Sequence, residues 1–430
     1  MGCSDGLNVE DKMKIIRMSK GLTQKGFAKI LGCNPVAISR IESKKEENKN
    51  HKYKKDQVKI ILKELGLEGA PIFEGEDVVY KNRLYTWLDA MINERNEEAE
   101  QFQKDLSVIM YLPFEPELML MYEIFDIKLI MLSNAALAEE MLKLLEKQKR
   151  LDDASNENLY HFNFTAGVIS FYKKKFKEAL RYYLKAEGLE VDDLNKSKGL
   201  NLNISYCYSE LGMHVYAIAS LERMHFLFDG EVVNLQWLKF LNALAVCHMS
   251  IGDTGKAKQL LDKAFIDAKS ISNERYINII LHNLGCVSIK TKEYDKALEY
   301  FEDAFNFFKE GDDYYLENLY YKARCLVALK SSQAKEVISC AKSALKDNEE
   351  YKLLFESLEH LLTLKDEQSR QFIQRETIPH LRDSFKYFKA LDYCDTLKAS
   401  FGKRESGAKI FKVDSIALEI SRKMMKGIDV

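Results

Sequence analysis

The chain has 430 residues, of which 64 are Lys or Arg and 66 are Asp or Glu, with 46% hydrophobic residues, 5 Pro and 20 Gly. This composition excludes intrinsic disorder and leaves enough apolar residues for several domains or one long helical array. We find no run of about 18 uncharged apolar residues and no basic-then-apolar N-terminal signal, so we expect a cytoplasmic protein that does not contact a membrane.

Positive charge is concentrated at the N-terminal end. Residues 1–65 contain 15 Lys and Arg against 8 Asp and Glu, a net charge of +7, whereas the remaining residues carry 49 against 58, a net charge of −9. A small basic part on an acidic body is typical of a protein that binds a polyanion with one end only. Nucleic acid is the first candidate.

Two short helices are predicted within this basic part. Thr23 is a favourable N-cap for a helix that starts at Gln24 and ends at Gly32, and Asn34 is a favourable N-cap for a second helix whose first residue is Pro35. Two short helices joined by a Gly-Cys-Asn turn form a helix-turn-helix unit. Its predicted core consists of the apolar residues at helical spacing, Phe27, Ala28, Leu31, Ile38 and Ile41.

The pattern Gly21-Leu22-Thr23-Gln24, Phe27-Ala28, Leu31-Gly32 and Ile38-Ser39-Arg40-Ile41-Glu42 resembles the Xre/Cro-type helix-turn-helix domain over about residues 8–66. The resemblance implies that the second helix enters the major groove of a double-stranded DNA operator. The residues it places against bases or phosphates are Thr23, Gln24, Asn34, Pro35, Val36, Ser39, Arg40 and Lys45. Pro35 and Val36 depart from the long polar side chains that often read bases in this family, so Asn34, Ser39 and Arg40 carry the expected hydrogen bonds.

A linker is expected after this domain. A helix is predicted to resume over residues 57–65, and the breakers Gly66, Gly69, Pro71 and Gly75 then predict a hinge over residues 66–80. We therefore divide the chain into a helix-turn-helix domain at 1–66, a linker at 67–82, a repeat domain at 83–365 and C-terminal helices at 366–430. The last segment either caps the repeat array or forms a dimer contact.

The body shows an internal repeat with a period near 39 residues. Alanines that begin amphipathic stretches are spaced by 39, 41, 38, 40, 40 and 37 residues, at Ala99, Ala138, Ala179, Ala217, Ala257, Ala297 and Ala334. A second marker follows most anchors by seven or eight residues, and a small residue precedes several of them by twelve. These offsets resemble the tetratricopeptide repeat, most clearly in Asn283-Leu284-Gly285, Ala297, Phe301 and Ala304. The predicted fold is all-α, with the N-terminal helix-turn-helix domain followed by a right-handed α-solenoid of extended repeats.

Asparagine recurs on the first helix of successive repeats, at Asn163, Asn203, Asn242, Asn283 and Asn318. An amide side chain carries both a donor and an acceptor, so such a ladder can hold the backbone of an extended peptide without reading its side chains. Lys239 is a further candidate for the same ligand. The alternative for each position is an ordinary polar residue on a helical turn.

Patterns for catalysis and metal binding are missing from the sequence. The eight cysteines form no C-x-x-C pair, the eight histidines lack metal-ligand spacing, and none of the nucleotide-binding, zinc-protease or nucleophile-elbow motifs occurs. We expect no enzyme activity, no metal and no cofactor.

Together, head and repeats resemble the peptide-responsive regulators of Gram-positive bacteria, the Rap, Rgg, NprR, PlcR and PrgX group. The resemblance implies a homodimeric transcription regulator of the quorum-sensing type, controlled by a short signalling peptide bound inside its repeat domain. Two alternatives remain open: a repeat scaffold that binds a protein partner, and a response-regulator phosphatase, both without a peptide ligand.

Overall fold

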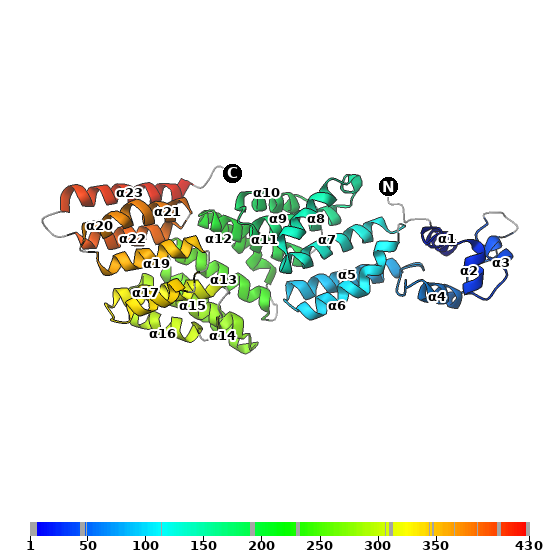
Figure 1. The fold of residues 1–430 in the computed structure, drawn as a ribbon, viewed down its shortest axis with the longest axis horizontal. Coiled ribbons are helices and arrows are strands. Elements are labelled where there is room, and N and C mark those ends of the chain that lie inside the picture. The colour runs from blue at the N-terminus through cyan, green and yellow to red at the C-terminus, as the bar shows by residue number, and fades with distance from the viewer. Residues whose placement is uncertain are drawn as a thin grey trace. The chain divides into compact units, whose positions relative to one another are not determined.

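The computed structural model describes residues 7–43, 48, 50–112, 114–189, 194–228, 233–305, 307–308, 313–343, 345, 348–364, 366–384, 386–401 and 406–426. Over these residues the chain is helical and has no β-strand (Figure 1). It divides into two compact units, Met1–Asp192 and Asp193–Val430. Among the described helices, none has the length and apolar character required to span a membrane.

The first unit begins with four short helices, which we call the head: α1 (Val9–Ser19), α2 (Gln24–Ile30), α3 (Pro35–Ile41) and α4 (Lys55–Glu64). Their ends follow the predicted signals. The Thr23 hydroxyl accepts a hydrogen bond from the Gly26 backbone N–H at 3.1 Å, and the side-chain oxygen Oδ1 of Asn34 accepts one from the Val36 backbone N–H at 2.9 Å. Gly32 adopts φ +62°, a left-handed conformation that glycine adopts without strain, and this ends α2.

The predicted head core is confirmed in its centre. Phe27, Ala28 and Ile38 are buried, and they pack with Met13 and Ile16 of α1. Leu31 and Ile41 are half-buried at the edge of the same cluster. Val58 and Ile61 of α4 complete this core, which therefore draws on all four helices, and one face of α3 remains outside it.

The connection between head and body, where a hinge is predicted, carries buried apolar side chains. The helix after it, α5, begins at Glu76, so only residues 67–75 connect the two parts. Leu67, Ala70 and Ile72 in this segment are at most 5% exposed, and the Glu76 carboxylate accepts hydrogen bonds from the backbone N–H groups of Ile72 and Phe73.

Antiparallel helix pairs follow in chain order. In the first unit they are α5 (Glu76–Ile92) with α6 (Asn96–Leu106), α7 (Pro116–Ser133) with α8 (Ala135–Glu146), and α9 (Asn156–Tyr172) with α10 (Phe176–Glu187). In the second unit they are α11 (Leu194–Glu210) with α12 (His214–His225), α13 (Leu235–Ser250) with α14 (Thr254–Ser270), α15 (Glu274–Lys290) with α16 (Tyr294–Phe305), and α17 (Asp313–Ala328) with α18 (Ala334–Ser343). Short 3₁₀ turns lie at η2 (Ser107–Tyr111), η3 (Lys149–Leu151) and η4 (Phe226–Phe228).

The alanine anchors explain how each pair closes. All seven anchors lie on the second helix of a pair, and each is fully buried. A larger side chain at these positions would hold the two helices apart. The facing position on the first helix is equally restricted: a Cβ built on Gly285 would lie 2.7 Å from the ring of Phe301, and one built on Gly167 would lie 2.4 Å from the ring of Tyr183. The repeat predicted from these offsets is thus the packing unit of the structure.

The second unit ends in α19 (Glu349–Leu362), α20 (Glu367–Phe372), η5 (Ile373–Thr377), α21 (Ile378–Asp383), α22 (Tyr387–Ser400) and α23 (Ser406–Lys426). The π-helical turn η5 lies just before Pro379, whose missing N–H interrupts the regular hydrogen-bond pattern. Helix α22 packs on α17. Arg324 of α17 donates to Asp392 of α22 at 2.7 Å, and the hydroxyls of Tyr320 and Tyr393 lie 3.1 Å apart. The residues after 365 therefore continue the packing of the last repeat.

Candidate DNA-binding and ligand-binding sites

One face of α3 is exposed to solvent, and its side chains do not pack into the head core. Ile38 is the buried residue of this helix, whereas Pro35, Val36, Ser39 and Arg40 are exposed. Positions 35, 36, 39 and 40 lie one helical turn apart and so share a side of the helix. A hydroxyl, a guanidinium and an apolar methyl pair on one short helix are groups that can contact base edges.

Three of the other predicted DNA contacts have structural roles in the head. The Thr23 and Asn34 side chains are exposed and cap α2 and α3. Gln24 is half-buried, and its side-chain amide donates to Glu42 Oε2 at 3.0 Å. Lys45 lies outside the described residues.

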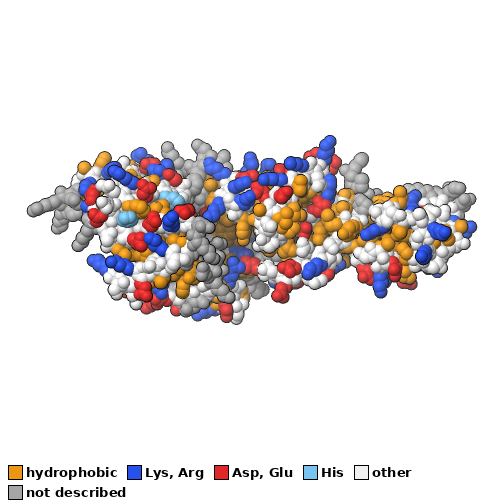
Figure 2. Space-filling model, in the orientation of Figure 1, with side chains coloured by type: hydrophobic (Ala, Val, Ile, Leu, Met, Phe, Trp, Pro, Cys, Tyr) orange, Lys and Arg blue, Asp and Glu red, His pale blue; other side chains and the backbone are white. Residues whose placement is uncertain are grey.

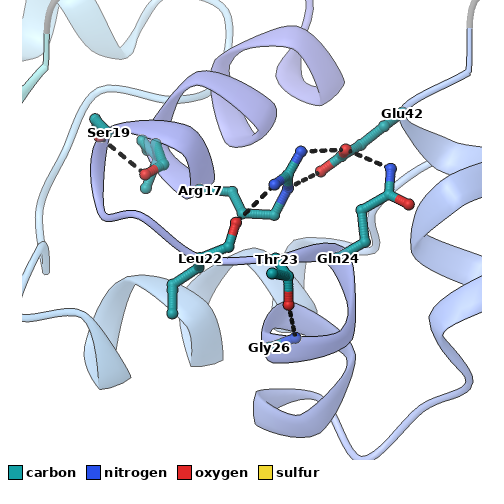
Figure 3. A network of polar contacts seen from close by, with 8 residues as sticks. Arg17, Ser19, Leu22, Thr23, Gln24, Gly26 and Glu42 are labelled. Carbon is teal, nitrogen blue, oxygen red and sulfur yellow. Dashed lines mark hydrogen bonds and ion pairs between the residues drawn. The ribbon is translucent and has the colours of Figure 1, made fainter.

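Glu42 is the centre of a polar network that the sequence did not reveal (Figure 3). Its carboxylate accepts from Arg17 Nε at 2.7 Å and from Arg17 Nη2 at 2.8 Å, and Arg17 Nη1 donates to the Leu22 carbonyl at 2.7 Å. The side chains of Arg17 and Glu42 are 11% and 1% exposed. The hydrogen bonds to Glu42 raise the pKa of Arg17 above its usual value. This network joins the last turn of α1 to the first residue of α2 and the end of α3, and thereby positions the exposed face of α3.

Basic side chains are distributed over the head, and Figure 2 shows several of them on the face in view. The exposed ones in the described head are Lys20, Lys25, Lys29, Lys52, Lys54, Lys55, Lys59 and Lys63, together with Arg40. Their summed positive potential attracts the phosphates of a nucleic acid irrespective of its sequence.

The second unit brings two members of the predicted asparagine ladder into contact. The first helices of its pairs touch one another in sequence, α11 with α13, α13 with α15, and α15 with α17. Asn283 of α15 donates its side-chain amide to Asn242 Oδ1 of α13 at 2.7 Å. This hydrogen bond does not involve the side-chain nitrogen of Asn242 or the side-chain oxygen of Asn283.

Asn163 and Asn203 have a common local geometry. Each donates its side-chain amide to the backbone carbonyl four residues earlier, Leu159 and Gly199 respectively, at 2.8 Å, and each is half-buried. Asn163 lies on α9 in the first unit, whereas Asn203 lies on α11 in the second. A hydrogen bond thus directly joins Asn242 and Asn283 of the predicted ladder.

Asn318 does not line the same surface. It is fully buried, its amide donates to the Phe301 carbonyl at 2.9 Å, and its oxygen lies 3.2 Å from His282 Nδ1. The interval from Asn283 to Asn318 is 35 residues, shorter than the repeat period, so Asn318 falls earlier on its helix and packs into the joint between α16 and α17. We correct the expectation for this residue: its role is structural.

A neighbouring polar side chain was missed from the sequence. The side-chain oxygen of Gln236 is buried on α13 and has no hydrogen-bond partner among the described residues. Gln236 lies one turn before the half-buried Lys239, which itself lies one turn before Asn242. The only available signal was the spacing of three residues between these polar positions. A buried acceptor without a partner is costly unless a ligand or water completes it.

Within the described residues, no group of three or more His, Cys, Asp or Glu side chains could hold a metal ion. The buried thiols on the first helices of the pairs in the second unit are poor nucleophiles, because burial raises the pKa of Cys207, Cys247 and Cys325 to about 12. These cysteines fill space between helices.

The fold is that of a helical repeat protein with a small, basic head of four short helices. The tetratricopeptide repeat family matches residues 280–307. The chain is 19% identical to the transcriptional activator NprA of Geobacillus stearothermophilus over 404 residues, covering 89% of this chain and 96% of NprA. It is 30% identical to the response regulator aspartate phosphatase A of Bacillus subtilis (strain 168) over 151 residues, covering 33% of this chain and 38% of the phosphatase.

Solved structures show the same fold. A Rap protein in complex with the competence and sporulation factor superposes with a TM-score of 0.69 at 15% identity, over 81% of this chain and 99% of that protein. NprR in complex with its cognate peptide NprX superposes with a TM-score of 0.61 at 21% identity, over 80% of this chain and 99% of NprR. The resemblance to the Rap and NprR group of repeat proteins is confirmed.

Proposed function

We propose that this protein is a DNA-binding transcription regulator controlled by a short signalling peptide that binds along α13 and α15 of its second unit. The similarity to NprA along nearly the whole chain supports the regulatory role, and the exposed face of α3 within a basic head supports DNA as the target. Two copies of the chain would present two heads to a symmetric operator.

The observation that carries the peptide part is the Asn242–Asn283 pair. An extended peptide presents alternating N–H and C=O groups, and the pair offers one donor and one acceptor that the bond between the two side chains does not use. The unpartnered oxygen of Gln236 on the same helix adds an acceptor, and Lys239 adds a positive charge for an acidic group or a terminal carboxylate of the ligand. The NprR relative was solved with its cognate peptide.

A response-regulator phosphatase is the second candidate. It is favoured by the 30% identity to a response regulator aspartate phosphatase over a third of the chain. A regulator binds operator DNA through α3, whereas a phosphatase removes phosphate from a response regulator without needing the head. Arg40 therefore separates the two candidates.

Replacing Arg40 by Ala is expected to weaken binding to a duplex from the region upstream of the protein's own gene by about 1–3 kcal/mol, roughly tenfold to a hundredfold. Arg40 is exposed, so the thermal unfolding curve should stay unchanged. Fluorescence anisotropy measures the affinity. The control is Arg181→Ala, which removes an exposed arginine from α10 of the repeat domain. An unchanged affinity would exclude α3 as the reading helix.

Replacing Asn242 and Asn283 together by Ala is expected to weaken peptide binding about tenfold to a hundredfold, because two side chains that each supply about 1 kcal/mol of hydrogen bonding are removed. Native mass spectrometry of the protein purified from its own host, with and without the upstream duplex, measures the bound peptide. The control Asn278→Ala removes an amide from α15 whose side chain bonds its own helix at Glu274. Equal peptide occupancy in the double variant and the wild type would contradict the proposed site.

A further inference from the structure

A buried ion pair joins the head to the body of the first unit. Lys12 lies on the inner side of α1, and its Nζ donates to Glu115 Oε1 at 2.8 Å and to the Pro71 carbonyl at 3.3 Å. The side chains of Lys12 and Glu115 are 9% and 5% exposed. Glu115 is the residue immediately before α7, the first helix of the second repeat. The pair therefore spans the connection between the domain that carries α3 and the domain that carries the repeats.

The surroundings of this pair are apolar and continuous. Lys12 Nζ lies 5.3 Å from the centre of the Phe114 ring, and Lys20 Nζ lies 4.7 Å from the centre of the Tyr111 ring. Met13 and Ile16 of the head belong to the same hydrophobic cluster as Leu118 of α7. Leu67, Ala70 and Ile72 of the connecting segment belong to this cluster as well, so head and body share one continuous apolar core.

We propose that Lys12, Pro71, Phe114 and Glu115 form a dock that fixes the orientation of the head on α7, and that a change in the repeat domain reaches the reading helix through this dock. The second part rests on the function proposed above; the first does not. Separating the pair would leave a charge in an apolar site, which is strongly unfavourable, so partial opening is disfavoured. The dock is consequently closed or fully open, which is the behaviour required of an element that switches between two states.

Hydrogen exchange on the full-length protein tests the dock without DNA. In Glu115→Gln we expect the amides of residues 67–73 to exchange at least tenfold faster than in the wild type, while α1, α2 and α3 keep their protection, because they pack together in the head. The combination Lys12→Met with Glu115→Leu replaces the pair by apolar groups and is expected to keep the wild-type protection. Glu74→Gln, which changes an exposed carboxylate in the same segment, is the control.

If the amides of Glu115→Gln exchange at the wild-type rates, the dock is overturned. It is also overturned if residues 67–73 of the wild-type protein exchange as fast as those of an unstructured chain. Faster exchange of α2 and α3 in both Glu115→Gln and the apolar combination would also overturn it, because the pair would then stabilise the head itself.

The role in signalling is tested with the upstream duplex. We expect Glu115→Gln to change the DNA affinity at least fivefold and Glu74→Gln to leave it unchanged. If Glu115→Gln opens the dock but binds the duplex with wild-type affinity, the repeat domain does not act on the DNA-binding helix through this contact. If the wild type does not bind the duplex, the proposed function fails, and the exchange experiment still decides whether the dock exists.

Discussion

Replacing Glu42 by Ala should destabilise the head by about 3–5 kcal/mol, because it leaves the Arg17 guanidinium buried without its carboxylate. The same change removes the acceptor of Gln24 and loosens the ends of α1, α2 and α3 together. A loss of this size is comparable to the whole stability of a domain this small. We therefore expect the head helices to unfold while the repeats remain folded.

Hydrogen exchange of α1, α2 and α3, followed by mass spectrometry, measures this effect. Glu98→Ala is the control, because Glu98 pairs with Arg95 on the surface, where both side chains are more than 40% exposed, and such pairs contribute about 1 kcal/mol or less. Arg17→Met combined with Glu42→Leu should recover much of the lost protection, because neither charge is then buried alone. Wild-type exchange in Glu42→Ala would show that the network does not stabilise the head.

Short-range patterns made much of the fold predictable. The caps at Thr23 and Asn34, the left-handed Gly32 and the alanine anchors each depend on residues within a few turns, where helical geometry fixes the spacing. The anchors also recur, so that one correct unit indicated the others. The short helices of the head and the repeat array were consequently both predictable from the sequence.

Long-range pairings were not predictable in the same way. Arg17 and Glu42 are 25 residues apart, and Lys12 and Glu115 are 103 apart. Nothing in a local pattern distinguishes such charges from solvated ones. The hinge between head and body was predicted from its Gly and Pro residues, and a local pattern does not show that Leu67, Ala70 and Ile72 there are buried. Asn318 failed for a related reason, because its position within a helical turn, rather than its interval in the chain, decides which side it faces.

The second large effect expected is a loss of stability in acid that originates at His214. This residue is 8% exposed at the start of α12, and burial, assisted by the charge of Lys290, lowers its pKa from 6.5 to about 4. Below pH 6.5 the unfolded chain takes up a proton at His214 that the folded chain does not accept until about pH 4. The free energy of unfolding should therefore fall by about 3 kcal/mol as the pH decreases from the pKa of the unfolded chain to that of the folded chain. Below about pH 4 this residue adds no further loss.

Urea unfolding at a series of pH values between about 7 and 4 measures the slope, and His214→Leu should reduce it by the equivalent of one proton. Part of the slope should persist in this variant, because burial also lowers the pKa of His282. The control is His51→Gln, which changes an exposed histidine of the head and should leave the slope as it is. If His214→Leu has the wild-type slope, the folded protein accepts the proton at His214 as readily as the unfolded chain does. The α11–α12 turn would then have to open in mild acid, because a charged imidazole at this site needs contact with water.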